Sequence, residues 1–152
     1  MEKMKTIVLM LSQKFPVTHS RSGEPTRFRY GFGVSKLHTI RKNKKGYWDK
    51  CAQEINEGKA ILSVREWTGR PYRSKMRILA EYKKIGLQHI TMSRSSEFPM
   101  PTAHVDGKFV SIYELALNDG LDLPDFIEWF FPNNESDSIF QGVILQLTDF
   151  RY

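Results

Sequence analysis

Three side chains that could do chemistry stand close together in the first third of the chain: Lys36, Thr39 and Arg41. A threonine hydroxyl becomes a nucleophile when a base removes its proton, and Lys36 is the nearest candidate base. That role needs a lowered lysine pKa, which burial or the neighbouring Arg41 would supply. Arg41 is itself suited to binding a phosphate or stabilising an oxyanion. The structural alternative is a Thr39 hydroxyl bonded to backbone, with an arginine–aspartate ion pair joining this segment to a helix.

A second group of rings and cations begins at Trp67, at the end of an expected strand. Arg70, Tyr72 and Arg73 follow it in a turn that contains glycine and proline. Aromatic rings beside cations bind single-stranded nucleic acids through base stacking and phosphate contacts. We therefore expect this group to hold a nucleotide from the side opposite Arg41. The alternative is a tight turn with Trp67 packed beneath it.

The charge of the chain is divided unevenly along its length. The formal net charge is +6, but no lysine or arginine stands between residues 109 and 150. The basic residues concentrate in residues 27–50 and 65–94 instead, where aromatic residues are interleaved with them. This distribution predicts a basic face that attracts a polyanion such as RNA and an acidic back. Alternatively, the rings fill the core and the charges only solvate strand edges.

Composition also excludes several kinds of site. With Cys51 as its single cysteine, the chain cannot form an intramolecular disulfide, and a cysteine-based zinc site is not expected. The four histidines lack the spacing of metal ligands, so we expect neither a metal nor a cofactor. No apolar run approaches the roughly 20 residues that span a bilayer. We expect no membrane association and a cytoplasmic location.

The pattern of apolar residues and breakers predicts one α+β domain over residues 1–152, because no linker or repeat divides the chain. About six or seven strands and two or three short helices are expected, arranged as a small, strongly bent sheet or barrel. Extended segments are predicted at 6–12, 28–32, 60–67, 75–82, 87–92, 104–105, 108–110 and 139–147. Helices are predicted at 47–57, 111–119 and 124–131, the first of them with Cys51 on its buried face.

The two C-terminal helices carry clear end signals. Ser111 and Glu114 have the spacing of a capping box at the start of the first helix. Gly120 ends that helix, where a residue with positive φ is needed. Asp122 then caps the second helix, which has Pro124 in its first turn.

The segment from Lys36 to Arg41, read Lys-Leu-His-Thr-Ile-Arg after Gly33, resembles the signature of the ASCH domain, a branch of the PUA-like superfamily. Residues 58–64 and 118–130 resemble two further segments of that family, and the order and spacing agree from about residue 27 to residue 150. There are differences. Gly33 stands one residue early, a helical insertion is expected near residues 42–58, and Asp119 replaces the glutamate of catalytic members.

The resemblance implies a PUA-like pseudo-barrel whose cleft binds RNA or a nucleotide. The residues expected to bind it are Lys36, His38, Thr39, Arg41, Trp67, Arg70, Tyr72 and Arg73. Some small members of the family are amidohydrolases that deacetylate N4-acetylcytidine, which implies Lys36, Thr39 and Asp119 as catalytic residues if this chain is an enzyme. A third possibility is a protein-interaction module that uses the acidic helices at 111–119 and 124–131.

Overall fold

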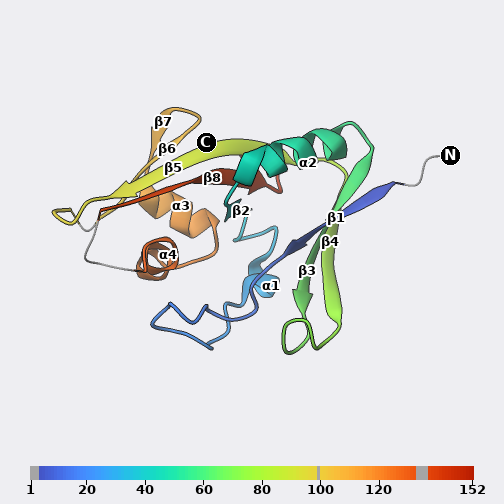
Figure 1. The fold of residues 1–152 in the computed structure, drawn as a ribbon, viewed down its shortest axis with the longest axis horizontal. Coiled ribbons are helices and arrows are strands. Elements are labelled where there is room, and N and C mark those ends of the chain that lie inside the picture. The colour runs from blue at the N-terminus through green and yellow to red at the C-terminus, as the bar shows by residue number, and fades with distance from the viewer. Residues whose placement is uncertain (1–3, 99, 133–136) are drawn as a thin grey trace.

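The strands form two sheets in the computed structural model, which describes residues 4–98, 100–132 and 137–152 (Figure 1). The smaller sheet has the order β1-β3-β4, with β1 (Lys5–Met10) parallel to β3 (Ala60–Trp67) and β4 (Met76–Tyr82) antiparallel to it. The larger sheet is antiparallel, with the order β2-β8-β5-β6-β7. Its strands are β2 (His38–Arg41), β5 (Gly86–Arg94), β6 (Thr102–Val105), β7 (Lys108–Val110) and β8 (Ser138–Gln146).

Four short α-helices complete the fold within the described residues. They are α1 (Phe28–Gly31), α2 (Tyr47–Asn56), α3 (Ile112–Asn118) and α4 (Leu123–Phe130), and a 3-10 turn, η1 (Lys44–Gly46), precedes α2. The fold is α+β as expected, and its described residues form eight strands and four α-helices, where about six or seven strands and two or three helices were expected. The described residues form two sheets rather than a closed barrel.

The segment at residues 28–32 is a correction, because it forms the one-turn helix α1 rather than a strand. Its alternating rings mimic the two-residue period of a strand. Arg27, however, takes a left-handed backbone conformation with φ of 62° and turns the chain into a helix. Phe28 is buried against Trp129, while Tyr30 is 74% exposed. The strand of this region is instead β2, ten residues further on.

The helix ends near the C-terminus confirm most of the signals in the sequence. Ser111 and Asp122 occupy the N-cap positions of α3 and α4, and Pro124 lies in the first turn of α4. Neither cap side chain makes a capping hydrogen bond, so the expected capping box is not formed. Gly120 has φ of +79°, as its place after α3 requires.

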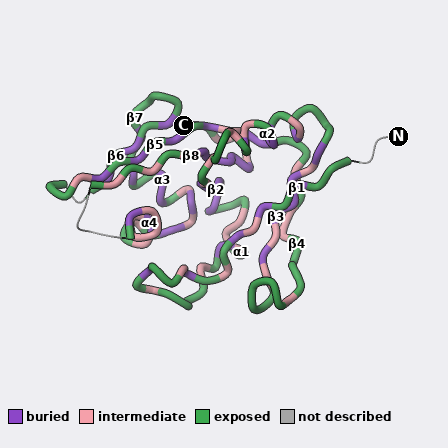
Figure 2. Tube along the Cα trace, in the orientation of Figure 1, coloured by how far each residue is buried: buried purple, intermediate pink, exposed green. Residues whose placement is uncertain are grey.

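Helix α2 connects the two sheets, because it packs against β3 and against β5 (Figure 1). Its buried face consists of Trp48, Cys51, Ala52 and Ile55, which confirms the predicted helix and the burial of the thiol. The buried residues lie mainly on the strands that face this core, whereas most residues of the β3–β4 turn are exposed (Figure 2). Within the described residues, no helix is long and apolar enough to cross a membrane.

Candidate functional site

A buried ion pair links the segment before β2 to the end of α3. Lys36 Nζ donates hydrogen bonds to Asp119 Oδ1 at 3.0 Å and to the Asp119 backbone oxygen at 2.8 Å. The ammonium also lies 4.1 Å from the centre of the Phe28 ring. Only 2% of Lys36 and 4% of Asp119 are exposed. The structure therefore brings together two residues that stand 83 positions apart in the chain.

Glycine at position 120 is needed for this approach as well as for its positive φ. A Cβ atom there would lie 3.1 Å from the Lys36 Cβ, which is tighter than ordinary van der Waals contact. The backbone of Lys36 and Asp119 also pairs as an isolated β-bridge, and the neighbouring Leu37 amide donates to Asn118. The pair is therefore held by backbone contacts on both sides and not by the side chains alone.

Burial and charge act in opposite directions on this pair. Burial lowers the pKa of the Lys36 ammonium, Asp119 opposes that shift, and Arg41 adds to it. Burial by itself would raise the pKa of the Asp119 carboxyl, but Lys36 and His38 outweigh it and hold that pKa below its ordinary value. A lowered lysine pKa favours the neutral amine that a general base requires, although the hydrogen bonds to Asp119 favour the ammonium.

Thr39 and Arg41 point to the same side of β2, because alternate residues of a strand share a face. Arg41 Nε donates to Thr39 Oγ1 at 3.2 Å, and its Nη2 donates to the Met10 backbone oxygen at 2.6 Å. The threonine hydroxyl is thus held by a side chain, not by backbone as the structural alternative expected. The same alternative expected an arginine–aspartate ion pair between this segment and a helix. In the structure the residue that forms an ion pair with Asp119 is Lys36.

One small cavity of about 100 Å³ is lined by four polar residues, Lys36, Thr39, Arg41 and Asp119. Its other walls are mostly apolar and include Phe28 and Trp129; the remaining lining residues are Leu11, Ser12, Ile40 and Phe130. Sites for small molecules usually enclose roughly 300–1,000 Å³. The cavity is therefore large enough for a small substituent but not for a whole nucleotide.

A larger, open cleft of about 690 Å³ adjoins the cavity. Its lining contains three cations, Lys14, Arg41 and Arg70, together with the half-buried Trp67 ring and no carboxylate among the described residues. The other lining residues come from the segments 10–13 and 68–71. Arg41 lines both the cavity and the cleft, so it stands where a ligand in the cleft would meet the buried pair. We refer to this space below as the open cleft.

The remaining predicted residues take different places. Trp67 and Arg70 line the open cleft, and the exposed Tyr72 ring lies 5.1 Å from the Trp67 ring without lining the cleft. Arg73 is exposed and lines none of the clefts described here.

His38 is a correction, because it is fully buried and its ring is out of reach of a base. It faces the opposite side of β2 from Thr39 and Arg41, since it alternates with them along the strand. Its Nε2 lies 2.6 Å from the Tyr152 hydroxyl, and its Nδ1 lies 3.4 Å from Asp119 Oδ1. His38 therefore lies within 3.4 Å of the buried carboxylate, but its Nδ1 makes no hydrogen bond among the described residues.

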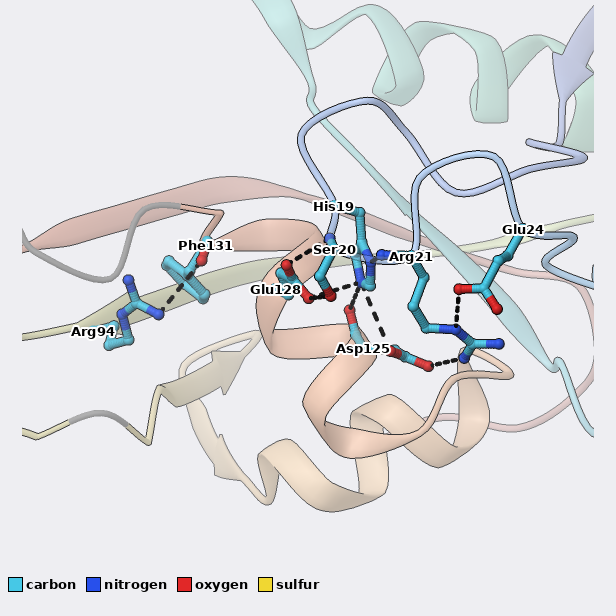
Figure 3. Close-up of polar contacts among 8 residues, drawn as sticks. All are labelled: His19, Ser20, Arg21, Glu24, Arg94, Asp125, Glu128 and Phe131. Atoms are coloured by element: carbon cyan, nitrogen blue, oxygen red, sulfur yellow. Dashed lines mark hydrogen bonds and ion pairs between the residues drawn. The ribbon is translucent and has the colours of Figure 1, made fainter.

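Sequence reasoning missed the contribution of residues 16–25, whose glycine and prolines predict only a loop. Helix α4 holds this segment in place (Figure 3). His19 Nδ1 accepts from the Arg21 amide at 3.0 Å, which leaves its Nε2–H to donate to the Asp125 backbone oxygen at 3.1 Å. Arg21 pairs with the Asp125 carboxylate, and both the Ser20 amide and its hydroxyl donate to Glu128. The loop therefore has a defined conformation, and Gln13 and Lys14, which precede it, line the open cleft.

No group of three histidine, cysteine, aspartate or glutamate residues that could hold a metal ion occurs in the part of the chain that the structure describes. Compared with protein-family models, curated proteins and solved structures, the chain matches none of them.

Proposed function

We propose that this chain is a PUA-like module of the ASCH type that binds RNA or a nucleotide in the open cleft. The observation that carries the proposal is the lining of that cleft, which combines three cations with an aromatic ring and no carboxylate. Cations bind phosphate oxygens and rings stack on bases, so this lining suits a nucleotide better than an apolar ligand. The volume of about 690 Å³ lies within the range of small-molecule sites.

The family and the finer fold are part of the same proposal. They rest on the resemblance of residues 33–41, 58–64 and 118–130 to the ASCH domain. The contact between Lys36 and Asp119 supports it, because the resemblance implies a shared site for these two residues. In this assignment Arg41 lies at the floor of the cleft, and Trp67 and Arg70 lie at its rim.

Two arginines of the same turn provide a matched test of the cleft. Arg70 lines the open cleft and Arg73 does not. Arg70→Ala and Arg73→Ala each remove one positive charge from the β3–β4 turn, so they differ only in their place relative to the cleft. We expect Arg70→Ala to weaken binding of fluorescein-labelled hexauridylate several-fold and to reduce the slope of log K against log salt by about 0.7. Arg73→Ala should change both much less. Fluorescence anisotropy titrations at three salt concentrations measure these quantities, and equal effects of the two variants would show that the cleft is wrongly assigned.

A second candidate function is amide hydrolysis, which is favoured by the presence of Lys36, Thr39 and Asp119 around one cavity. In this mechanism the Thr39 hydroxyl attacks the acetyl carbonyl of N4-acetylcytidine while neutral Lys36 accepts its proton. The amine of cytidine leaves with a proton returned to it, and water then releases acetate from Thr39. Asp119 orients the Lys36 amine, and Arg41 lies close enough to Thr39 to stabilise the oxyanion.

Thr39→Val tests this candidate, because valine keeps the shape of threonine and removes only the hydroxyl. Hydrolysis predicts that the wild-type protein releases cytidine from N4-acetylcytidine and that Thr39→Val releases none. Chromatography of the reaction mixture detects the product. Cytidine release by both proteins at equal rates would remove Thr39 from the mechanism, whereas no release by the wild type would leave binding alone.

A further inference from the structure

A second cleft of about 590 Å³ adjoins the first one. Its lining residues are Gln13, Pro25, Thr26, Arg27, Phe28, Arg29, Tyr30 and Glu66. Gln13 lines both clefts, whereas Glu66 and Trp67 line one cleft each, because successive residues of β3 point to opposite faces. The two spaces therefore meet beside Gln13, and each is large enough for one nucleotide.

The second cleft, like the first, combines an aromatic ring with cations. The Tyr30 ring is 74% exposed, and the Arg29 guanidinium lies 4.6 Å from its centre and donates to its hydroxyl. This contact holds the ring at the surface, where its other face is available for stacking. Arg27 is exposed and makes no side-chain hydrogen bond or ion pair among the described residues, so its charge is available for a phosphate.

The one carboxylate of this cleft is already neutralised. Glu66 is buried, and its Oε1 lies 3.3 Å from Arg29 Nη1 and 3.0 Å from Arg77 Nη1. Two arginines around one glutamate leave an excess of positive charge beside the cleft. A phosphate is therefore attracted here and not repelled.

Gln13 is suited to contact a strand that passes from one cleft to the other. Its backbone oxygen accepts from the Thr26 amide, whereas its side-chain amide has no hydrogen-bond partner within the described part of the chain. An amide offers both donors and an acceptor, which match the polar edges of bases and the sugar hydroxyls.

We propose that the ligand is a single-stranded oligonucleotide whose adjoining nucleotide occupies the second cleft, with its base stacked on Tyr30 and its phosphate bound by Arg27. This inference rests on the proposed function, because it extends the ligand of the open cleft by at least one nucleotide. A free mononucleotide fills only one of the two clefts, whereas a strand engages both rings. The geometry is that of a positively charged groove with successive stacking platforms.

The experiment compares ligand lengths and two exposed tyrosines. Labelled hexauridylate bound to the protein is displaced by unlabelled uridine monophosphate, by the dinucleotide and by the hexamer. We expect affinity to rise at least tenfold from the mononucleotide to the dinucleotide. Tyr30→Ala should weaken hexamer binding by about tenfold, because stacking contributes about 1–3 kcal/mol per base. It should leave binding of the mononucleotide unchanged.

Tyr113→Ala is the matched control, since Tyr113 is 65% exposed on α3 and lines neither cleft. Equal affinities for the mononucleotide and the longer ligands, or equal effects of the two tyrosine variants, would overturn the inference while leaving the open cleft as a nucleotide site. Failure of every uridylate ligand to bind would instead overturn the proposed function, and this inference with it.

Discussion

Asp119→Ala is expected to lower the free energy of unfolding by about 3–5 kcal/mol, because it leaves the Lys36 ammonium buried without its partner. The ammonium is within 3.0 Å of the carboxylate and only 2% of Lys36 is exposed, so water cannot replace the lost contact without rearrangement. Urea denaturation followed by tryptophan fluorescence measures the difference. The exposed ion pair between Lys5 and Glu54 provides the contrast, since Lys5→Ala should cost about 0–1 kcal/mol.

A double variant separates the ion pair from mere loss of packing. The double variant Lys36→Met/Asp119→Ala replaces both partners and so removes both buried charges. Such replacements often change the free energy of unfolding little. We therefore expect the double variant to be more stable than Asp119→Ala alone, although it carries one more substitution. If the two single losses simply added up in the double variant, the pair would not be coupled and the argument from burial would be wrong.

The effect of Asp119→Ala should also depend on pH. The pKa of this carboxyl is lower in the folded protein than its ordinary value of 3.8, because its interactions with Lys36 and His38 outweigh burial. A group of this kind stabilises the fold above its unfolded pKa, and the stabilisation is lost as the pH falls through the folded pKa. The stability difference between wild type and variant should thus be complete at pH 5–7 and shrink below about pH 4.

The elements with local signals were predictable from the sequence. Helices α3 and α4 begin after Ser111 and Asp122 as expected, and Gly120 takes the predicted positive φ. The extended segments predicted at 104–105 and 108–110 are β6 and β7, and Asp106 and Gly107 between them have φ of 49° and 81°, which suits a tight hairpin. In each case the signal and the structure involve residues within a few positions of one another.

Features that depend on distant contacts were not predictable in this way. The parallel pairing of β1 with β3 joins Lys5 to Ala60, and nothing in either segment specifies the other. The alternation of rings in residues 28–32 is compatible with a strand, but Arg27 turns the chain into a helix that places Phe28 against the distant Trp129. Propensity is a weak guide where such packing competes with it.

The candidate site shows the same division. Trp67 and Arg70 were expected at a cleft because cations and rings alternate in their turn, and both line it. His38 was misplaced, because a strand turns alternate residues to opposite faces and the position of the sheet was unknown. Lys14 was missed, since it pairs with Pro25 across a loop whose Ser20 is held by Glu128, more than 100 residues away.

Arg41→Gln should have the largest effect on ligand binding, because Arg41 lies between the open cleft and the buried pair. Hydrogen bonds to charged groups contribute about 1.5–3 kcal/mol, so we expect hexauridylate to bind about 10- to 150-fold more weakly. The salt slope should fall by about 0.7, which corresponds to one phosphate contact on a single strand. Glutamine retains an amide donor at the position of Nε, where it can reach Thr39 Oγ1, but it loses the bond to the Met10 oxygen, so urea denaturation is needed to separate loss of binding from loss of fold.

Two further variants decide how Arg41 acts. Arg151→Gln is the matched control, because Arg151 also donates to backbone oxygens, those of Thr148 and Phe150, but lines neither cleft. This variant should change the affinity for hexauridylate less than threefold.

Arg41→Lys keeps the charge and loses the planar fork of the guanidinium. Weakened binding with an unchanged salt slope in Arg41→Lys would mean that the fork fixes the ligand geometrically, whereas wild-type affinity would mean that charge alone is sufficient. If Arg41→Gln bound like Arg151→Gln, the ligand would not reach the floor of the cleft, and the link between the cleft and the Lys36–Asp119 pair would be refuted.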